Sequence, residues 1–100
     1  MSLKIHDRFL EHVKTIAAAD ALGGPYALSR VAAVWLEAAC YASRRLTDGF
    51  VPTQALVDSR ADDDALAVAR ALASANLMVE IDGGFRFHDW NDYNPKKAAR

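Results

Sequence analysis

Cysteine is nearly absent from the 100-residue chain, and long apolar runs are missing altogether. The one cysteine, Cys40, cannot form an internal disulfide, which suits a reducing compartment. It lies in an apolar helical pattern, where a lone cysteine usually packs in a core, so we expect it to be buried. No run reaches the ~20 apolar residues of a membrane span. The first residues carry charges at Lys4, Asp7 and Arg8 and no apolar segment, so we expect no signal peptide, no membrane contact and a cytoplasmic location.

An excess of charge of either sign is also missing. Lysine and arginine total 12 and aspartate and glutamate total 13, which gives a net charge of -1 at pH 7. Charge alone therefore indicates neither a nucleic acid nor a membrane surface as the partner. Hydrophobic residues make up 52% of the chain, but many are alanines, which bury little area. A chain of this length fits one domain, whose core must rest on its larger side chains.

The sequence lacks the local motifs of the common catalytic sites. It contains no glycine-rich phosphate loop, and no serine or cysteine stands in a glycine elbow. Two His-Asp pairs, His6-Asp7 and His88-Asp89, together with His12 raise the alternative of a metal-dependent hydrolase. Such a site needs several histidines and aspartates on a helical bundle, whereas this chain has 3 histidines and His88 falls in a predicted strand. We therefore expect no catalytic residues, no metal and no cofactor, and a protein that is not an enzyme.

Helical periodicity dominates the first half of the chain. Residues 26–46 carry an apolar stripe at three- and four-residue steps, which predicts a long central helix with Trp35 as a core anchor. A shorter helix is predicted before it and ends at the Gly-Gly-Pro break of residues 23–25. The apolar residues of the shorter helix are Ile5, Phe9, Val13 and Ile16. The stripe of the long helix comprises Leu28, Val31, Ala32, Trp35, Ala38, Ala39, Ala42 and Leu46.

Turn residues divide the second half into short elements. Asp48-Gly49 predicts a turn, Phe50-Val51 predicts a very short strand, and Pro52 begins a short helix that continues over residues 54–60. A further helix is predicted over residues 61–77, with three aspartates, Asp62, Asp63 and Asp64, at the end where negative charge complements the helix dipole. Its buried face is expected to comprise Leu66, Ala69, Leu72, Ala73 and Leu77.

The stretch MVEIDGGFRFHDW predicts a β-hairpin. Val79 and Ile81 alternate with a polar residue, and the Asp-Gly-Gly of residues 82–84 suits the positive φ of a tight primed turn. Strand alternation divides the second strand into two faces, Phe85, Phe87 and Asp89 on one and Arg86, His88 and Trp90 on the other. We expect the two phenylalanines to point into the core and the HDW segment to end the fold rather than to carry chemistry.

The predicted elements run helix, long helix, short strand, helix, helix, hairpin. This is the order of a winged helix-turn-helix, an α+β fold in which the hairpin is the wing and the short strand joins it in a small antiparallel sheet. We expect a single domain over residues 1–95, followed by a basic tail over residues 96–100.

Several motifs carry a family resemblance. The segments LTDGFVP and ALASANLMVEIDGGFRFHDWNDYNP resemble small winged-helix domains of actinobacterial and phage proteins related to the N-terminal domains of replication initiators and replisome organisers. The opening DRFLEHVKTIA is similar to the same group, although Val13 stands where the group has a proline. The resemblance covers residues 5–95 and implies a DNA-binding role in phage or plasmid replication or regulation.

Basic residues give a candidate DNA surface that acidic neighbours oppose. In a winged helix the second helix of the pair enters the major groove with its N-terminal end at the bases. Here that end carries the three aspartates of residues 62–64, whose charges repel phosphates. Double-stranded DNA is the first predicted partner, and the alternative is a host or phage protein bound by a non-catalytic adaptor or inhibitor. The predicted DNA contacts are Arg60, Arg70, Arg86, Lys96, Lys97 and Arg100.

Overall fold

The computed structural model describes residues 9–88 and residue 90. Its helical elements are the 3-10 turn η1 (Phe9–Glu11), α1 (Val13–Leu22), α2 (Ala27–Arg45), α3 (Thr53–Val57) and α4 (Ala65–Ser74). Its strands are β1 (Phe50–Pro52), β2 (Met78–Ile81) and β3 (Gly84–Phe87), which form one antiparallel sheet in the order β1-β3-β2. The fold is therefore α+β, as the sequence predicts.

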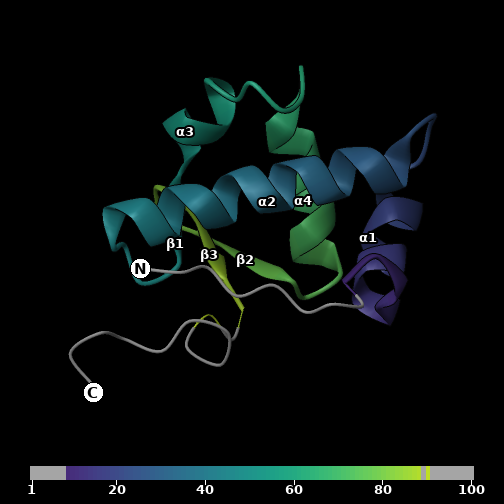
Figure 1. The fold of residues 1–100 in the computed structure, drawn as a ribbon, viewed down its shortest axis with the longest axis horizontal. Coiled ribbons are helices and arrows are strands. Elements are labelled where there is room, and N and C mark those ends of the chain that lie inside the picture. Colours follow the sequence, from purple (N-terminus) through teal and green to yellow (C-terminus); the bar gives the residue numbers. More distant parts are fainter. Residues whose placement is uncertain (1–8, 89, 91–100) are drawn as a thin grey trace.

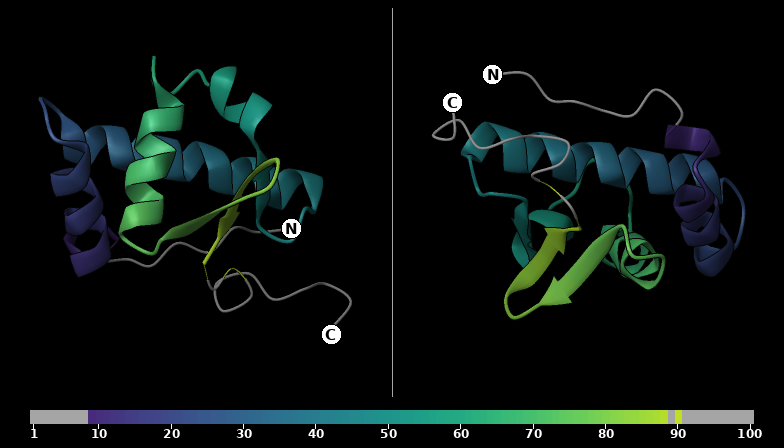
Figure 2. Two further views of the ribbon diagram at one scale, coloured as in Figure 1. Left: turned by 180° about the vertical axis from the view of Figure 1, so that it is seen from behind. Right: turned by 90° about the horizontal axis from the view of Figure 1, so that it is seen from below.

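The long helix α2 is the element on which the others are arranged. It runs across the molecule in Figure 1, with α1 at one end, α4 crossing it and the sheet toward the other end. Figure 2 shows the sheet on one side of α2, with the hairpin of β2 and β3 extending away from it. The prediction of a helix over residues 26–46 is confirmed, because Tyr26 and Leu46 flank it, each with positive φ. Within the part of the chain that the structure describes, no helix is long and apolar enough to cross a membrane.

The predicted hairpin and its junction with the short strand are confirmed. Val79 pairs with Arg86 and Ile81 with Gly84 across β2 and β3, while Phe50 of β1 pairs with Arg86 from the other side. The turn differs from the primed type that the sequence suggests. Of its two central residues only the second, Gly83, has positive φ (85°), whereas primed turns need it at the first.

Aromatic side chains join four parts of the chain in the core. The ring of Trp35 on α2 lies 4.5 Å from that of Phe9 and 5.5 Å from that of Phe87, which in turn lies 5.1 Å from Trp90. Trp35, Phe85 and Phe87 are buried, as predicted. Trp90 is buried as well, and a Cβ on Gly49 would come within 2.8 Å of it, so the glycine makes room for the indole. The tryptophan of the HDW segment therefore closes the core; Asp89 lies outside the described residues.

The predicted apolar face of the first helix is wrong. Val13 is 74% exposed and Ile16 is also exposed, whereas the buried residues of α1 are Thr15, Ala18 and Ala19. Phe9 does pack against the core, but from the separate turn η1. Small side chains let α1 approach α2 and α4 closely, so the helix buries its small residues rather than its large ones.

Burial on the other helices departs from the predicted stripes in smaller ways. On α2 the ends of the stripe, Leu28 and Leu46, are exposed, and Val34 is buried although it lies off the stripe. Cys40 is exposed, not buried as expected. It follows the exposed Leu36 by one helical turn, on the flank of α2 that faces away from the core. The predicted face of α4 is confirmed at Ala69 and Leu72, and the structure adds Ala65, Val68 and Ala71.

Candidate interaction surface

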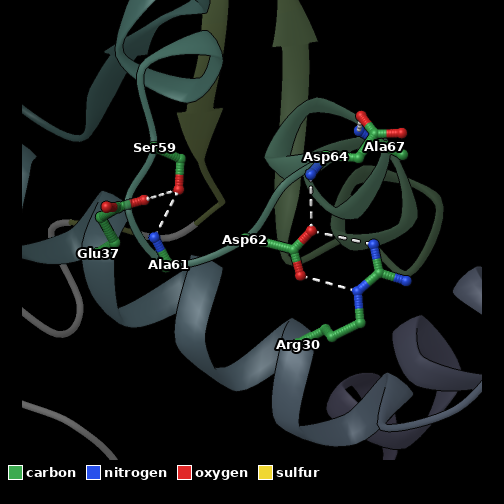
Figure 3. Close-up of polar contacts among 7 residues, drawn as sticks. All are labelled: Arg30, Glu37, Ser59, Ala61, Asp62, Asp64 and Ala67. Atoms are coloured by element: carbon green, nitrogen blue, oxygen red, sulfur yellow. Dashed lines mark hydrogen bonds and ion pairs between the residues drawn. The ribbon is translucent and has the colours of Figure 1, made fainter.

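The loop between α3 and α4, residues 58–64, is held against α2 by side-chain hydrogen bonds (Figure 3). The two residues of α2 that hold it are Arg30 and Glu37. Because 3.6 residues make one helical turn, these two side chains stand about two turns apart on the same face of α2. We call Arg30, Glu37, Ser59 and Asp62 the loop clamp.

The first half of the clamp is an ion pair with two hydrogen bonds. Arg30 Nε and Nη2 donate to the two carboxylate oxygens of Asp62 at 2.7 and 3.0 Å, and Asp62 Oδ1 also accepts the Asp64 backbone N–H at 2.8 Å. The Asp62 side chain is only 6% exposed. The Arg30 hydrogen bond lowers the pKa of Asp62 and outweighs burial, which would raise it. The same bond is the main cause of the raised pKa of Arg30. Such a bidentate pair fixes the orientation of the loop as well as its position.

The second half of the clamp satisfies backbone groups of the loop. The Ser59 hydroxyl donates to one carboxylate oxygen of Glu37, and the Arg60 backbone N–H donates to the other at 3.0 Å. Ser59 Oγ in turn accepts the Ala61 N–H at 3.0 Å. Two loop N–H groups therefore bond to protein side chains: that of Arg60 ties the loop directly to Glu37 on α2, and that of Ala61 bonds to Ser59 within the loop.

The three aspartates before α4 have three different environments. Asp62 points inward onto Arg30, and Asp64 is the N-cap of α4, whose carboxylate accepts the Ala67 N–H at 3.3 Å. Asp63 and Asp64 are exposed. The expectation that all three carboxylates oppose an approaching phosphate is therefore wrong for Asp62, because Arg30 neutralises it. The sequence did not predict the loop clamp. The seven-residue spacing of Arg30 and Glu37 places them on one face of a helix but does not indicate which residues they bind.

The predicted DNA contacts do not gather in one place. Arg60 is exposed in the clamped loop, and Arg70 is exposed on α4, where its Nε lies 3.8 Å from a carboxylate oxygen of Glu80 on β2. Arg86 is exposed on β3. The strand register puts Glu80 and Arg86 on opposite faces of the hairpin, so Arg70 and Arg86 lie on opposite sides of it. The remaining three, Lys96, Lys97 and Arg100, lie outside the described residues.

The segment from α3 to the end of the hairpin carries a net negative charge. Residues 53–88 contain three basic side chains, the arginines 60, 70 and 86, against six acidic ones. The acidic residues are Asp58, Asp62, Asp63, Asp64, Glu80 and Asp82. Pairing of Asp62 with Arg30 leaves five carboxylates against three cations. A duplex presents one negative charge per ~1.7 Å, so this balance opposes its approach.

The sheet has an apolar face on the side away from α2. The register places six residues on it, which we call the outer sheet face: Phe50, Pro52, Val79, Ile81, Gly84 and Arg86. Val79 is 44% exposed and Ile81 is 36% exposed, and Phe50 and Pro52 are partly exposed. The solvent face of an antiparallel sheet is usually polar. Here Arg86 is the single charged side chain among six positions.

The histidines have separate environments. His12 is the N-cap of α1, and its Nδ1 accepts the Lys14 N–H at 3.1 Å. His88 is exposed at the end of the hairpin, and His6 lies outside the described residues. Among residues 9–88 and 90, no three His, Cys, Asp or Glu side chains are placed to share a metal ion.

No family model, curated protein or solved structure matches the chain. Its function is therefore inferred from the charges, contacts and exposure of the residues described above.

Proposed function

We propose that the chain forms a winged-helix domain. The order of α2, β1, α3, α4, β2 and β3 supports this proposal, as does the strand order β1-β3-β2, in which the first strand pairs with the last. In this interpretation α3 and α4 are the helix-turn-helix pair, the loop clamp holds the turn between them, and the hairpin is the wing.

This winged-helix domain acts as a non-catalytic protein-interaction module, an adaptor or inhibitor that docks on another protein. The charge balance of residues 53–88 carries the proposal. Those residues make up the two helices and the hairpin that a DNA-binding winged helix turns toward the duplex. With carboxylates outnumbering cations there, the fold is present without the electrostatic surface that DNA binding needs.

The exposed side of α4 also suits a protein partner better than the bases of a DNA duplex. Its exposed residues are Arg70 and Ser74, with Ala67 partly exposed beside them. Reading bases in the major groove relies on long side chains that make paired hydrogen bonds, such as arginine, asparagine or glutamine. Only Arg70 has this chemistry, and it lies next to Glu80.

Affinity capture tests this function. The full chain, carrying a tag, is used to capture proteins from a lysate of an actinobacterial host, with and without nuclease treatment. We expect a partner protein whose capture survives nuclease, and which forms a complex of defined stoichiometry with the chain when both are purified. Capture that disappears with nuclease would contradict the proposal.

The second candidate is DNA binding in replication or regulation. The loop clamp favours it, because Arg30 removes one of the three carboxylates at the start of α4 and fixes the end of the helix that would meet the bases. The Arg70–Glu80 pair is exposed on both sides, so Arg70 is free to exchange Glu80 for a phosphate at small cost.

Three charge variants test the second candidate in a duplex-binding assay. If the domain binds DNA, Asp63→Asn strengthens binding, Arg86→Gln weakens it, and a triple variant of Arg86, Lys96 and Lys97 to glutamine abolishes it. Asp62→Asn is not a suitable variant, because it removes the partner of Arg30. Equal affinities for all variants would exclude the predicted wing-and-tail contact.

A further inference from the structure

We infer that the outer sheet face is the docking surface, and that its partner is an apolar protein segment that carries a carboxylate. This inference rests on the proposed protein-interaction function and names the surface and the partner's chemistry.

Two rows of side chains make up the face. In the first row Phe50, Arg86 and Val79 stand opposite one another on the three strands, and in the second row Pro52, Gly84 and Ile81 do so. Neighbouring strands lie about 4.8 Å apart, so the Arg86 side chain rises between two apolar neighbours. The Phe50 ring reaches toward the hairpin turn, since a Cβ on Gly83 would lie 3.9 Å from its Cζ.

Backbone packing leaves no room for a side chain at Gly84, the central position of the second row. A Cβ on Gly84 would lie 2.2 Å from the carbonyl oxygen of Val51, so β1 approaches β3 too closely for any side chain at this position. Gly84 is buried, because the backbone of Val51 and Pro52 fills the space that a Cβ at this position would enter. The accessible part of the face therefore combines the exposed apolar side chains of Val79 and Ile81 and the partly exposed Phe50 and Pro52 with one cation, Arg86.

Apolar residues on this face do not complete the core. The core side of the same strands is already filled by Val51, Met78, Phe85 and Phe87, all of them buried. Contiguous exposed apolar side chains mark interaction sites more often than scattered ones do. Val79 and Ile81 are such neighbours on one strand, on either side of Glu80.

Charge complementarity decides which occupant fits. A carboxylate that reaches Arg86 makes a charge-assisted pair, while its apolar neighbours cover Phe50, Val79 and Ile81. A second copy of this chain is a poorer occupant, because twofold packing of identical faces brings one Arg86 toward the other. Duplex DNA offers anions but no apolar surface to cover the flanks.

Amide chemical shifts of the full, isotope-labelled chain test the inference with two defined probes. One is a short peptide of alternating leucine and glutamate, and the other has lysine in place of glutamate; both are acetylated and amidated. We expect the glutamate peptide at about 1 mM to shift amides of β1, β2 and β3. We expect the lysine peptide to leave them unchanged.

Matched variants separate the two parts of the surface. Arg86→Gln should weaken binding of the glutamate peptide by about tenfold and remove the preference for it. Val79→Thr and Ile81→Thr keep the β-branched shape but remove apolar surface, and they should also weaken binding of the glutamate peptide. Val13→Thr makes the same chemical change at an exposed site on α1 and should have no effect.

Several outcomes would overturn the inference. These are equal affinity for the two peptides, absence of any shift, shifts centred on α1, and concentration-dependent shifts of the sheet without peptide, which would indicate a second copy. Shifts of the same amides by duplex DNA would also overturn it. A captured partner that binds Arg86→Gln and Val79→Thr as tightly as the unchanged chain would overturn this inference alone. The absence of any nuclease-resistant partner would instead overturn the proposed function.

Discussion

The two faces of the small sheet are both mainly apolar, yet only one of them is mainly buried. On the side toward α2, Met78 pairs with Phe87 and Val51 with Phe85, and all four side chains are buried. On the other side Val79 and Ile81 remain partly exposed around Arg86. Strand alternation alone predicts a polar outer face, so the comparison separates residues that fold the domain from residues available for binding.

The largest expected effect belongs to the inner side. Trp35 packs its ring on Phe9 and on Phe87, which links α2 to the sheet. Trp35→Ala should lower the free energy of unfolding by roughly 3–5 kcal/mol, the usual range for a buried aromatic. Denaturant unfolding measures it, and an unchanged midpoint would contradict the assignment of Trp35 as the anchor of the inner face.

A substitution at the junction between β1 and β3 should cause the next largest loss of stability. A Cβ at Gly84 overlaps the Val51 carbonyl oxygen, which belongs to backbone and cannot rotate away. Gly84→Ala should therefore cost about 2–3 kcal/mol and push β1 away from β3. Chemical shifts of Phe50 and Val51 report the movement. A variant with unchanged stability and shifts would show that the strands are less closely packed than described here.

The loop clamp should give a smaller effect that depends on pH. Because the pKa of Asp62 is lower in the folded chain, its pair with Arg30 stabilises the fold above the unfolded pKa of about 3.9 and loses this contribution as the pH falls through the lower folded value. Asp62→Asn should therefore be less stable than the unchanged chain at neutral pH, with the difference shrinking below about pH 4. Thermal unfolding across this range measures it.

Asp63→Asn is the control for the clamp, since it removes the same charge from an exposed neighbour. The difference between the two variants isolates the ion pair from net charge. Equal acid sensitivity in both would contradict a role for Arg30 in holding the loop.

The smallest effect on stability is expected on the outer side. Val79→Thr and Ile81→Thr alter partly exposed residues and should change the free energy of unfolding by less than about 0.5 kcal/mol. The same variants are expected to weaken binding of the glutamate peptide, as proposed above. A stability loss comparable to that of Trp35→Ala would mean that the outer face belongs to the core and would remove the contrast between the two faces.

Local patterns predicted much of the fold, and packing decided the rest. The long helix and the hairpin were predictable because an apolar stripe and an Asp-Gly-Gly break are short-range signals. The buried face of α1 was not, because Val13 and Ile16 look like core residues until the close approach of alanine-bearing helices is known. Cys40 was misplaced for a related reason, since an almost wholly apolar helix gives no sign of which flank faces outward.

The candidate site was less predictable than the fold. Arg86 was identified from the sequence, and strand alternation correctly placed its side chain on the other face of β3 from Phe85 and Phe87. The apolar residues beside it were not predictable, because they depend on which strands pair with β3 on each side. Arg30 and Asp62 are 32 residues apart, and several other arginines were available as partners for the aspartate. Such long-range pairs follow from the tertiary fold rather than from spacing.

A salt titration of duplex binding tests the central proposal that this domain contacts protein rather than DNA. The full chain is titrated into a labelled duplex, starting at about 50 mM salt, where electrostatic binding is strong. The acidic balance of residues 53–88 predicts no saturable binding at any salt concentration. Saturable binding that weakens with salt at a log-log slope of about -3, as three or four phosphate contacts would give, and that Arg86→Gln weakens further, would contradict the claim.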